Sequence, residues 1–240
     1  MSKVKQATKI VYKAEAINII TTQYSEKFEK YRNRRGRRKR NFDKMSQEER
    51  KKCLEQKIKG LYKVIKDITD ISKLNEFNYF VTCSGCDRKK LNQYLDRLRK
   101  ADPNKKNLIL ASWGKNRILH YHLMIYTDIL SKDDLIIKGK DMDIEVKEIY
   151  NQQGLTGYFI KNVVNIISIL KQDDENLLEI QKEIYKYSKI LTSSRYLAKV
   201  ETIKNPSEEQ IAEVCKNNHY IEGIEYSKGS SNIKIDKFTR

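Results

Sequence analysis

The sequence predicts an α+β fold in which helices pack on an antiparallel sheet. Residues 77–83 and 117–127 alternate polar and apolar side chains with the two-residue period of a strand. Apolar residues recur at helical spacing before, between and after these two segments. The core elements follow the order strand, helix, strand, strand. They lack the regular strand–helix–strand alternation of a parallel sheet, so an antiparallel arrangement is favoured.

Residues 1–75 are expected to form a basic helical extension. Residues 1–30 show weak helical periodicity. Ser46 and Glu49 then match the capping box that begins a helix. Behind this cap, apolar residues recur at intervals of four and three, which predicts a helix with one apolar stripe: Leu54, Ile58, Leu61, Ile65 and Ile68.

Residues 76–200 are expected to hold the sheet and its helices. The alternation in the first strand places four side chains on one face: Phe77, Tyr79, Val81 and Cys83. Further strands are predicted at residues 107–112, 117–127 and, more weakly, 143–150, with a polar loop at residues 131–140. Helices are predicted through residues 91–98, 154–170 and 174–187. The second of these helices has a buried stripe made by Phe159, Val163, Ile166 and Leu170.

Residues 201–240 are expected to contain one helix and a loose tail. Ser207 and Gln210 form another capping-box pattern directly after Pro206. The segment after Gly229 is polar, which predicts a poorly ordered end.

The charge balance indicates a polyanionic partner. Lys and Arg number 49 against 32 Asp and Glu, which gives a net charge of +17. Seven of the nine residues from 32 to 40 are basic: Arg32, Arg34, Arg35, Arg37, Arg38, Lys39 and Arg40. Because like charges this dense repel one another, the run favours nucleic-acid binding. An acidic protein partner and a solvated tail are the alternatives.

Several protein classes are excluded by composition. No apolar run approaches the roughly 18 residues of a membrane helix. The first 30 residues show no signal-peptide pattern, because Lys13, Glu15 and Asn18 interrupt the apolar stretch. Four cysteines do not make a disulfide framework, so a reducing cytoplasm is expected. Cys83 and Cys86 have no second pair with which to hold zinc.

Two of the three histidines lie in the best strand. His120 and His122 are two residues apart, so they project from one face of that strand and are able to bind one divalent ion. The alternative is a pair of half-buried histidines satisfied by backbone carbonyls. Leu119, Tyr121 and Leu123 fill the opposite face. We therefore expect that neither histidine is needed for packing.

A tyrosine and a lysine share one face of the helix that follows. Tyr158 and Lys161 are three residues apart, on the polar edge beside the buried stripe. A tyrosine hydroxyl with a cation one turn away is a candidate nucleophile with an electrostatic helper. Such a pair also arises by chance in a chain with 15 tyrosines.

In order and spacing, these motifs resemble the HUH endonucleases, and specifically the rolling-circle replication initiator (Rep) proteins of bacterial plasmids and phages. The resemblance rests on the His120-x-His122 strand followed by the Tyr158-x-x-Lys161 helix. Three further segments support it and extend it over roughly residues 32–206: the basic run before a capped helix, Phe80-Val81-Thr82-Cys83 in place of the first sheet motif, and Ser194-Arg195-Tyr196-Leu197 before Pro206.

The resemblance implies a fold and an activity. The core would be HUH/RRM-like, with a ferredoxin-like sheet. Tyr158 would attack a phosphodiester of one strand, leaving a 5′-phosphotyrosine link and a free 3′-OH for rolling-circle replication, and the strand would later be rejoined. His120 and His122 would hold Mg²⁺ or Mn²⁺. Lys161 would stabilise the developing charge, and Arg195 would contact DNA together with the basic run.

The resemblance also implies partners and a location. These are single- and double-stranded origin DNA, with a host polymerase, in the cytoplasm of a bacterial cell carrying the plasmid or phage. The sequence has no Gly-x-x-x-x-Gly-Lys-Ser/Thr pattern, so unwinding is expected from a host helicase.

One position departs from the family pattern. Members usually have a glutamate eight residues before the first histidine as a third metal ligand, and Ser112 stands there. Asp87 or water would then complete the site. The alternatives are a transposase or mobilisation relaxase on the same core, a catalytically weakened origin-binding regulator, and an RNA-binding module that uses its sheet for stacking.

Overall fold

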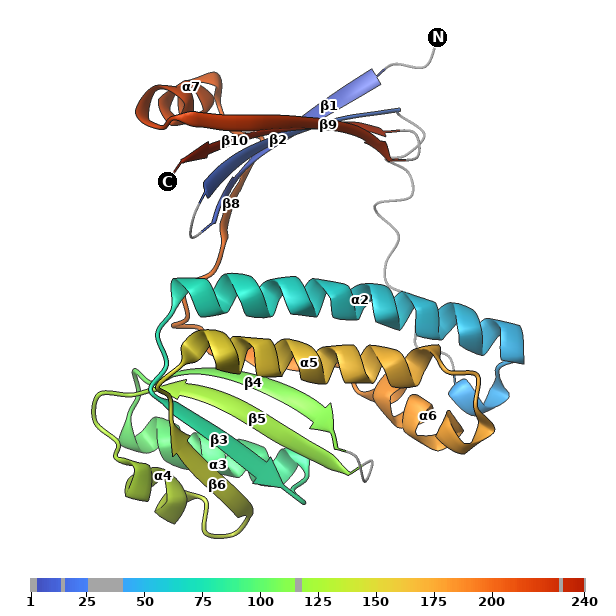
Figure 1. Ribbon diagram of the computed structural model, residues 1–240, viewed down its shortest axis with the longest axis vertical. Helices are drawn as coiled ribbons and strands as arrows, with labels where there is room; N and C mark the ends of the chain where they lie inside the picture. Colours follow the sequence, from blue (N-terminus) through green and yellow to red (C-terminus); the bar gives the residue numbers. More distant parts are fainter. Residues whose placement is uncertain (1–3, 14–15, 26–40, 115–117, 229–230, 240) are drawn as a thin grey trace. The chain divides into compact units, whose positions relative to one another are not determined.

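The computed structural model describes residues 4–13, 16–25, 41–114, 118–228 and 231–239, and it divides into two compact units (Figure 1). One unit joins the two ends of the chain, residues 1–39 and 199–240, and the other comprises residues 40–198. These boundaries differ from the predicted ones. The helix that the sequence assigned to an N-terminal extension belongs to the second unit, because its apolar stripe packs there.

The first unit is a five-stranded antiparallel sheet with one helix. Its elements are β1 (Val4–Tyr12), β2 (Ala16–Ser25), β8 (Glu201–Lys204), α7 (Glu208–Asn217), β9 (Tyr220–Lys228) and β10 (Ser231–Thr239). The strand order is β8-β1-β2-β10-β9. Ile10, Ile17, Ile19 and Phe238 form a small core with Val214 of α7. The capping box of Ser207 and Gln210 begins α7, as the sequence predicts.

Two predictions for this unit are wrong. The described parts of residues 1–30 are strands and not helix, because β1 and β2 pair as a hairpin in which Ile10 faces Ile19. Residues 231–239 are not loose, because β10 pairs with both β2 and β9, and Phe238 faces Ile17. The pairings of β1 with β8 and of β2 with β10 join segments that lie far apart in the sequence. The basic run of residues 32–40 lies outside the described residues.

The second unit is an antiparallel sheet with helices on both faces. Its strands are β3 (Tyr79–Ser84), β4 (Lys106–Trp113), β5 (Leu119–Tyr126), β6 (Asp143–Glu148) and β7 (Leu191–Ser193), in the order β6-β3-β5-β4-β7. Its α-helices are α2 (Gln47–Leu74), α3 (Arg88–Ala101), α4 (Lys132–Lys138), α5 (Gln152–Lys171) and α6 (Leu178–Lys186), with short 3₁₀ turns at Phe42–Lys44 and Glu175–Leu177. The predicted α+β class with an antiparallel sheet is confirmed.

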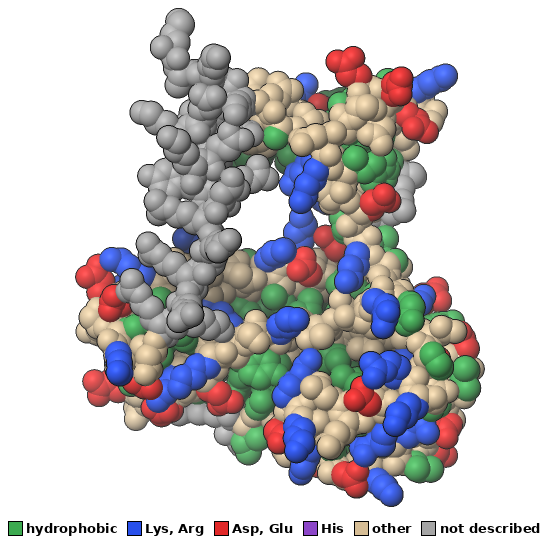
Figure 2. All heavy atoms as spheres, turned by 180° about the vertical axis from the view of Figure 1, so that it is seen from behind, with side chains coloured by type: hydrophobic (Ala, Val, Ile, Leu, Met, Phe, Trp, Pro, Cys, Tyr) green, Lys and Arg blue, Asp and Glu red, His purple; other side chains and the backbone are tan. Residues whose placement is uncertain are grey.

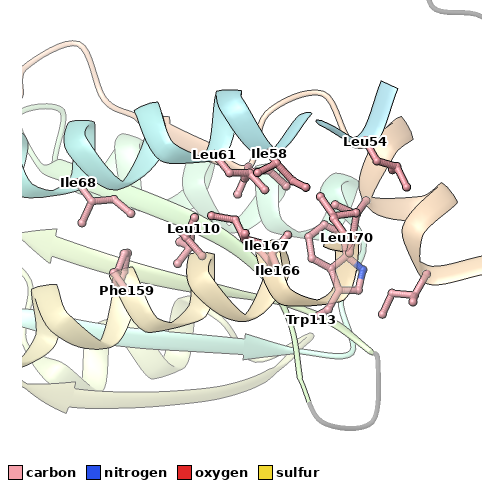
Figure 3. Packing of buried hydrophobic residues seen from close by; sticks show 14 of the residues in the cluster. Leu54, Ile58, Leu61, Ile68, Leu110, Trp113, Phe159, Ile166, Ile167 and Leu170 are labelled. Atoms are coloured by element: carbon pink, nitrogen blue, oxygen red, sulfur yellow. The ribbon is translucent and has the colours of Figure 1, made fainter. Parts of the chain in front are cut away.

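Alternation along the strands gives this unit two cores. On one face, Leu108, Leu110 and Met124 pack against Phe159 and the rest of the α5 stripe, and α2 covers α5 (Figures 1 and 3). Figure 3 shows Leu61 and Ile68 of α2 pointing toward α5. On the other face, Val81, Tyr121 and Leu123 pack against Leu91, Tyr94 and Leu98 of α3. The sheet therefore has one face under α5, where the histidines lie, and one under α3.

Capping boxes begin both α2 and α4, and only the first of them was predicted from the sequence. Ser46 accepts a hydrogen bond from the backbone of Glu49, and the Glu49 side chain accepts one from the backbone of Ser46, which confirms the predicted start of α2. Residues 131–140 were predicted to be a loop, but they contain α4, which Ser131 and Asp134 cap in the same way. None of the described helices is long and apolar enough to cross a membrane.

Candidate functional site

The two histidines project from β5 on the face that α5 covers. Strand pairing places Ser112 of β4 opposite His120, and Thr82 of β3 opposite His122. The two imidazole rings lie 4.7 Å apart between centroids, at 81° to each other. The sequence prediction that both side chains leave the same face of one strand is confirmed.

His122 is part of the core, contrary to the expectation that neither histidine is needed for packing. Its side chain is buried, with 2% of the residue exposed. The Phe80 ring stacks on it at 5.6 Å between centroids, and the Phe159 ring lies 6.3 Å away. Burial, with a smaller contribution from nearby His120, lowers the pKa of His122 to about 3. The ring is therefore neutral at physiological pH, as a metal ligand must be.

His120 is half-buried and has a defined tautomer. Its Nδ1 lies 3.1 Å from the backbone oxygen of Ile118. Because a carbonyl oxygen only accepts, Nδ1 carries the proton and Nε2 keeps its lone pair. A Cβ on Gly114 would come within 3.1 Å of the ring, so glycine leaves room for this orientation. A backbone carbonyl that orients a histidine in this way is a common second partner of a metal ligand.

Tyr158 meets the histidines from α5. Its hydroxyl oxygen lies 3.2 Å from Nε2 of His122, and the Thr82 hydroxyl lies 3.4 Å from Nδ1 of the same ring. When Nδ1 donates to Thr82, Nε2 faces Tyr158 with its lone pair. Tyr158 remains 41% exposed, so part of the residue is accessible to a substrate from outside. The structure thus brings together His120, His122 and Tyr158, which are 36 or more residues apart across the two motifs.

The other predicted site residues are not gathered at this point. Lys161 is exposed one turn beyond Tyr158 and makes no ion pair with a described residue. Arg195 lies over the Tyr196 ring, beyond the end of β7. Ser194, next to it, pairs with Asn107, five residues along β4 from Ser112, which is about 16 Å at the rise of a strand. Arg195 is thus at the far end of the sheet from the histidines.

The basic run that was predicted to bind DNA, from Arg32 to Arg40, lies outside the described residues. On the face drawn in Figure 2, the described Lys and Arg side chains are interspersed with Asp and Glu.

Ser112 and Asp87, the two side chains considered as a third metal ligand, both have other hydrogen-bond partners. The Ser112 hydroxyl donates to Oδ1 of Asn162 at 2.8 Å. Asp87 caps α3 by accepting from the backbone of Lys90 at 2.8 Å, and α3 covers the opposite face of the sheet. Within the described ranges, no cluster of three or more His, Cys, Asp or Glu side chains is placed to hold a metal ion. Nε2 of His120 and Nε2 of His122 would supply the nitrogen part of a divalent-ion site. Because Nε2 of His122 lies 3.2 Å from the Tyr158 hydroxyl, an ion bound there would take the place of that hydroxyl, and its remaining ligands would come from water or substrate.

Sequence reasoning missed three residues that shape this site: Phe80, Thr82 and Asn162. Phe80 and Thr82 alternate with the core residues of β3, so their opposite orientation follows from the strand period. Asn162 lies four residues after Tyr158, one helical turn further along α5. Its bond to Ser112 joins residues 50 positions apart and has no signal in the sequence.

Comparisons with known proteins add no functional assignment. No family model matches the chain, and neither does any curated protein. Among solved structures, the chain has a distant likeness to the hypothetical protein ORF119 from Sulfolobus islandicus rod-shaped virus 1. That likeness has 18% sequence identity and a TM-score of 0.31, and it covers 47% of this chain and 97% of the viral one.

Burial of His122 makes stability depend on pH. Because its pKa is about 3 in the folded chain and about 6.5 when unfolded, only the unfolded state takes up the proton between these values. The free energy of unfolding should therefore decrease as the pH is lowered, by about 2 kcal/mol from pH 7 to pH 5. Urea unfolding at both pH values measures this decrease. A His122→Phe variant should not show this decrease. An equal decrease in that variant would contradict the attribution of the pH dependence to His122.

Proposed function

We propose that this protein nicks one strand of DNA by tyrosine transesterification and later rejoins it, as a replication initiator. The observation that carries the proposal is the Tyr158 hydroxyl, 3.2 Å from Nε2 of His122 on a residue that is 41% exposed, beside a second imidazole whose lone pair is free. A nucleophile with an orienting imidazole and a place for a cation is what phosphodiester attack requires.

The chemistry follows from the residues. The Tyr158 oxygen forms a bond to phosphorus, and the bond from phosphorus to the 3′ oxygen breaks. The hydroxyl of Tyr158 loses its proton and the departing 3′ oxygen gains one. Rejoining is the reverse, with the 3′-OH attacking the phosphotyrosine. A divalent ion held by His120 and His122 would polarise a non-bridging phosphate oxygen. Lys161, exposed on the same helix face, is suited to contact the phosphate.

Partners follow from charge. The net charge of +17 and the basic run of residues 32–40 support binding of double-stranded origin DNA, and the site supports a single strand beside Tyr158. Unwinding and synthesis would come from a host helicase and polymerase. The proposed place of action is the cytoplasm of a cell that carries the replicon.

A covalent adduct tests the activity directly. The protein is incubated with Mn²⁺ and a randomised pool of single-stranded DNA labelled at the 3′ end. Because the 5′ phosphate of the downstream fragment stays on Tyr158, the label should move with the protein in a denaturing gel and disappear on proteolysis. Tyr158→Phe removes the attacking oxygen, so the adduct should vanish while DNA affinity remains. Tyr196→Phe, at another exposed tyrosine, is the matched control.

A second candidate is a catalytically weakened origin-binding regulator. It is favoured by Ser112, which occupies the usual position of a carboxylate ligand and donates its hydroxyl to Asn162. Under this alternative the wild type binds duplex origin DNA but captures no label with Mn²⁺. A transposase or relaxase would form the adduct, and only its target DNA would differ.

A further inference from the structure

A chain of hydrogen bonds connects the histidine strand to the backbone of Tyr158. The Ser112 hydroxyl donates to Oδ1 of Asn162 at 2.8 Å, and Nδ2 of Asn162 donates to the backbone oxygen of Tyr158 at 2.9 Å. Ser112 is 1% exposed and pairs with His120 across β4 and β5. The chain therefore begins beside one candidate ligand and ends on the residue that carries the nucleophile.

The orientation of the Asn162 amide follows from its partners. The backbone oxygen of Tyr158 only accepts, so the NH₂ group must face it, which leaves Oδ1 toward Ser112. Ser112 then has to donate, since Oδ1 only accepts. Only one orientation of the Asn162 amide therefore satisfies both of its partners. The proton of the Ser112 hydroxyl is therefore committed to α5.

The turn of α5 that carries Tyr158 has a reason to need such support. Gly157 directly precedes Tyr158, and a Cβ there would meet nothing within 4 Å. A glycine inside a helix leaves the backbone freer and costs about 0.5–1 kcal/mol relative to alanine. Reaction with a bound phosphate depends on the position of the attacking oxygen to within about 1 Å. A bond from the next turn to the Tyr158 carbonyl restricts that position.

We propose that Asn162 is a positioning residue for Tyr158 and that Ser112 holds Asn162 in place. This rests on the proposed nicking activity. The hydroxyl end of Tyr158 lies 3.2 Å from Nε2 of His122, and Asn162 holds the backbone end of Tyr158. It acts on the rate of attack through the placement of the nucleophile.

The first test compares two asparagines on the same helix. The Asn165 side chain is exposed and makes no hydrogen bond with another described side chain or backbone group, so Asn165→Ala is the matched control for Asn162→Ala. The probe is the single-stranded oligonucleotide that the wild type captures from the randomised pool, with Mn²⁺. We expect Asn162→Ala to slow single-turnover adduct formation about 10- to 100-fold. Its oligonucleotide Kd and melting temperature should stay near those of the wild type, and Asn165→Ala should react normally.

The second test isolates the Ser112 hydroxyl. Ser112→Thr and Ser112→Val add side chains of nearly equal volume to a buried position, and only threonine keeps a donor. We expect the threonine variant to react faster than the valine variant by about tenfold. Because both residues act through one hydrogen-bond chain, combining Ser112→Val with Asn162→Ala should cost no more than Asn162→Ala alone.

The outcomes separate this inference from the function on which it rests. A wild type that captures no oligonucleotide contradicts the proposed nicking activity. A wild type that forms the adduct, with Asn162→Ala equally fast, overturns the positioning role. That role is also overturned if the loss in Asn162→Ala lies wholly in oligonucleotide affinity. Equal rates for the threonine and valine variants remove Ser112 from the chain.

Discussion

Replacing His120 by alanine is expected to abolish adduct formation while leaving the fold and DNA affinity nearly unchanged. His120 is half-buried and belongs to neither hydrophobic core of its unit, so its loss leaves no cavity there. Changing a residue that only orients a metal ligand already costs 10- to 100-fold, so losing the ligand itself should cost more than about 100-fold. Adduct rates, melting temperature and the Kd for DNA measure these three quantities, and Mn²⁺ titration calorimetry measures the loss of the ligand.

The neighbouring histidine gives a contrasting result. His122→Ala should also stop the reaction, but it removes a buried ring that packs on Phe80 and should destabilise the chain by about 2–4 kcal/mol. His120→Ala is therefore the cleaner variant. If it cleaves at the wild-type rate, or if it unfolds, the ligand assignment is wrong.

Replacing four arginines of the basic run is expected to weaken duplex DNA binding for every sequence tested. The run contains four closely spaced cations that are too crowded to be paired within the chain: Arg34, Arg35, Arg37 and Arg38. Contacts between such groups and phosphates carry little sequence information. Each lost phosphate contact lowers the slope of log K against log salt concentration by about 0.9, so alanine at all four should flatten it by up to about three to four units. Duplex binding measured between 50 and 200 mM salt gives the slope.

The same variant has a second readout. Cleavage of a short single strand at saturating enzyme should survive, because the chemistry belongs to His120, His122 and Tyr158. An unchanged salt slope would identify the run as a solvated tail or a protein-docking arm. Loss of single-strand cleavage would instead assign these arginines to the active-site groove.

Much of the site could be predicted from local patterns. The two-residue period of β5 is enough to put His120 and His122 on one face, and the stripe of α5 from Phe159 to Leu170 is enough to turn Tyr158 away from the core. Both patterns work because they are set by neighbours within one element. The nearness of Tyr158 to His122 required the packing of α5 on the sheet, which the sequence supplies only through the family resemblance.

Two of the errors arose where distant segments decide the structure. β2 pairs with β10, some 200 residues later. The burial of His122 depends on α5 crossing over β5, with Phe80 and Phe159 against the ring. Neither effect leaves a local signal in the sequence.

The sheet of the first unit cannot form completely until β10 has been synthesised. β1 and β2 precede β10 by some 200 residues along the chain. At about 5–20 residues per second, the first hairpin waits roughly 10–40 s for that strand. An isolated hairpin is marginally stable, and its unpaired edge is open to other chains during that time. The unit of residues 40–198 has all its strands before β10, so it is able to fold on the ribosome while the hairpin of β1 and β2 still waits for β10.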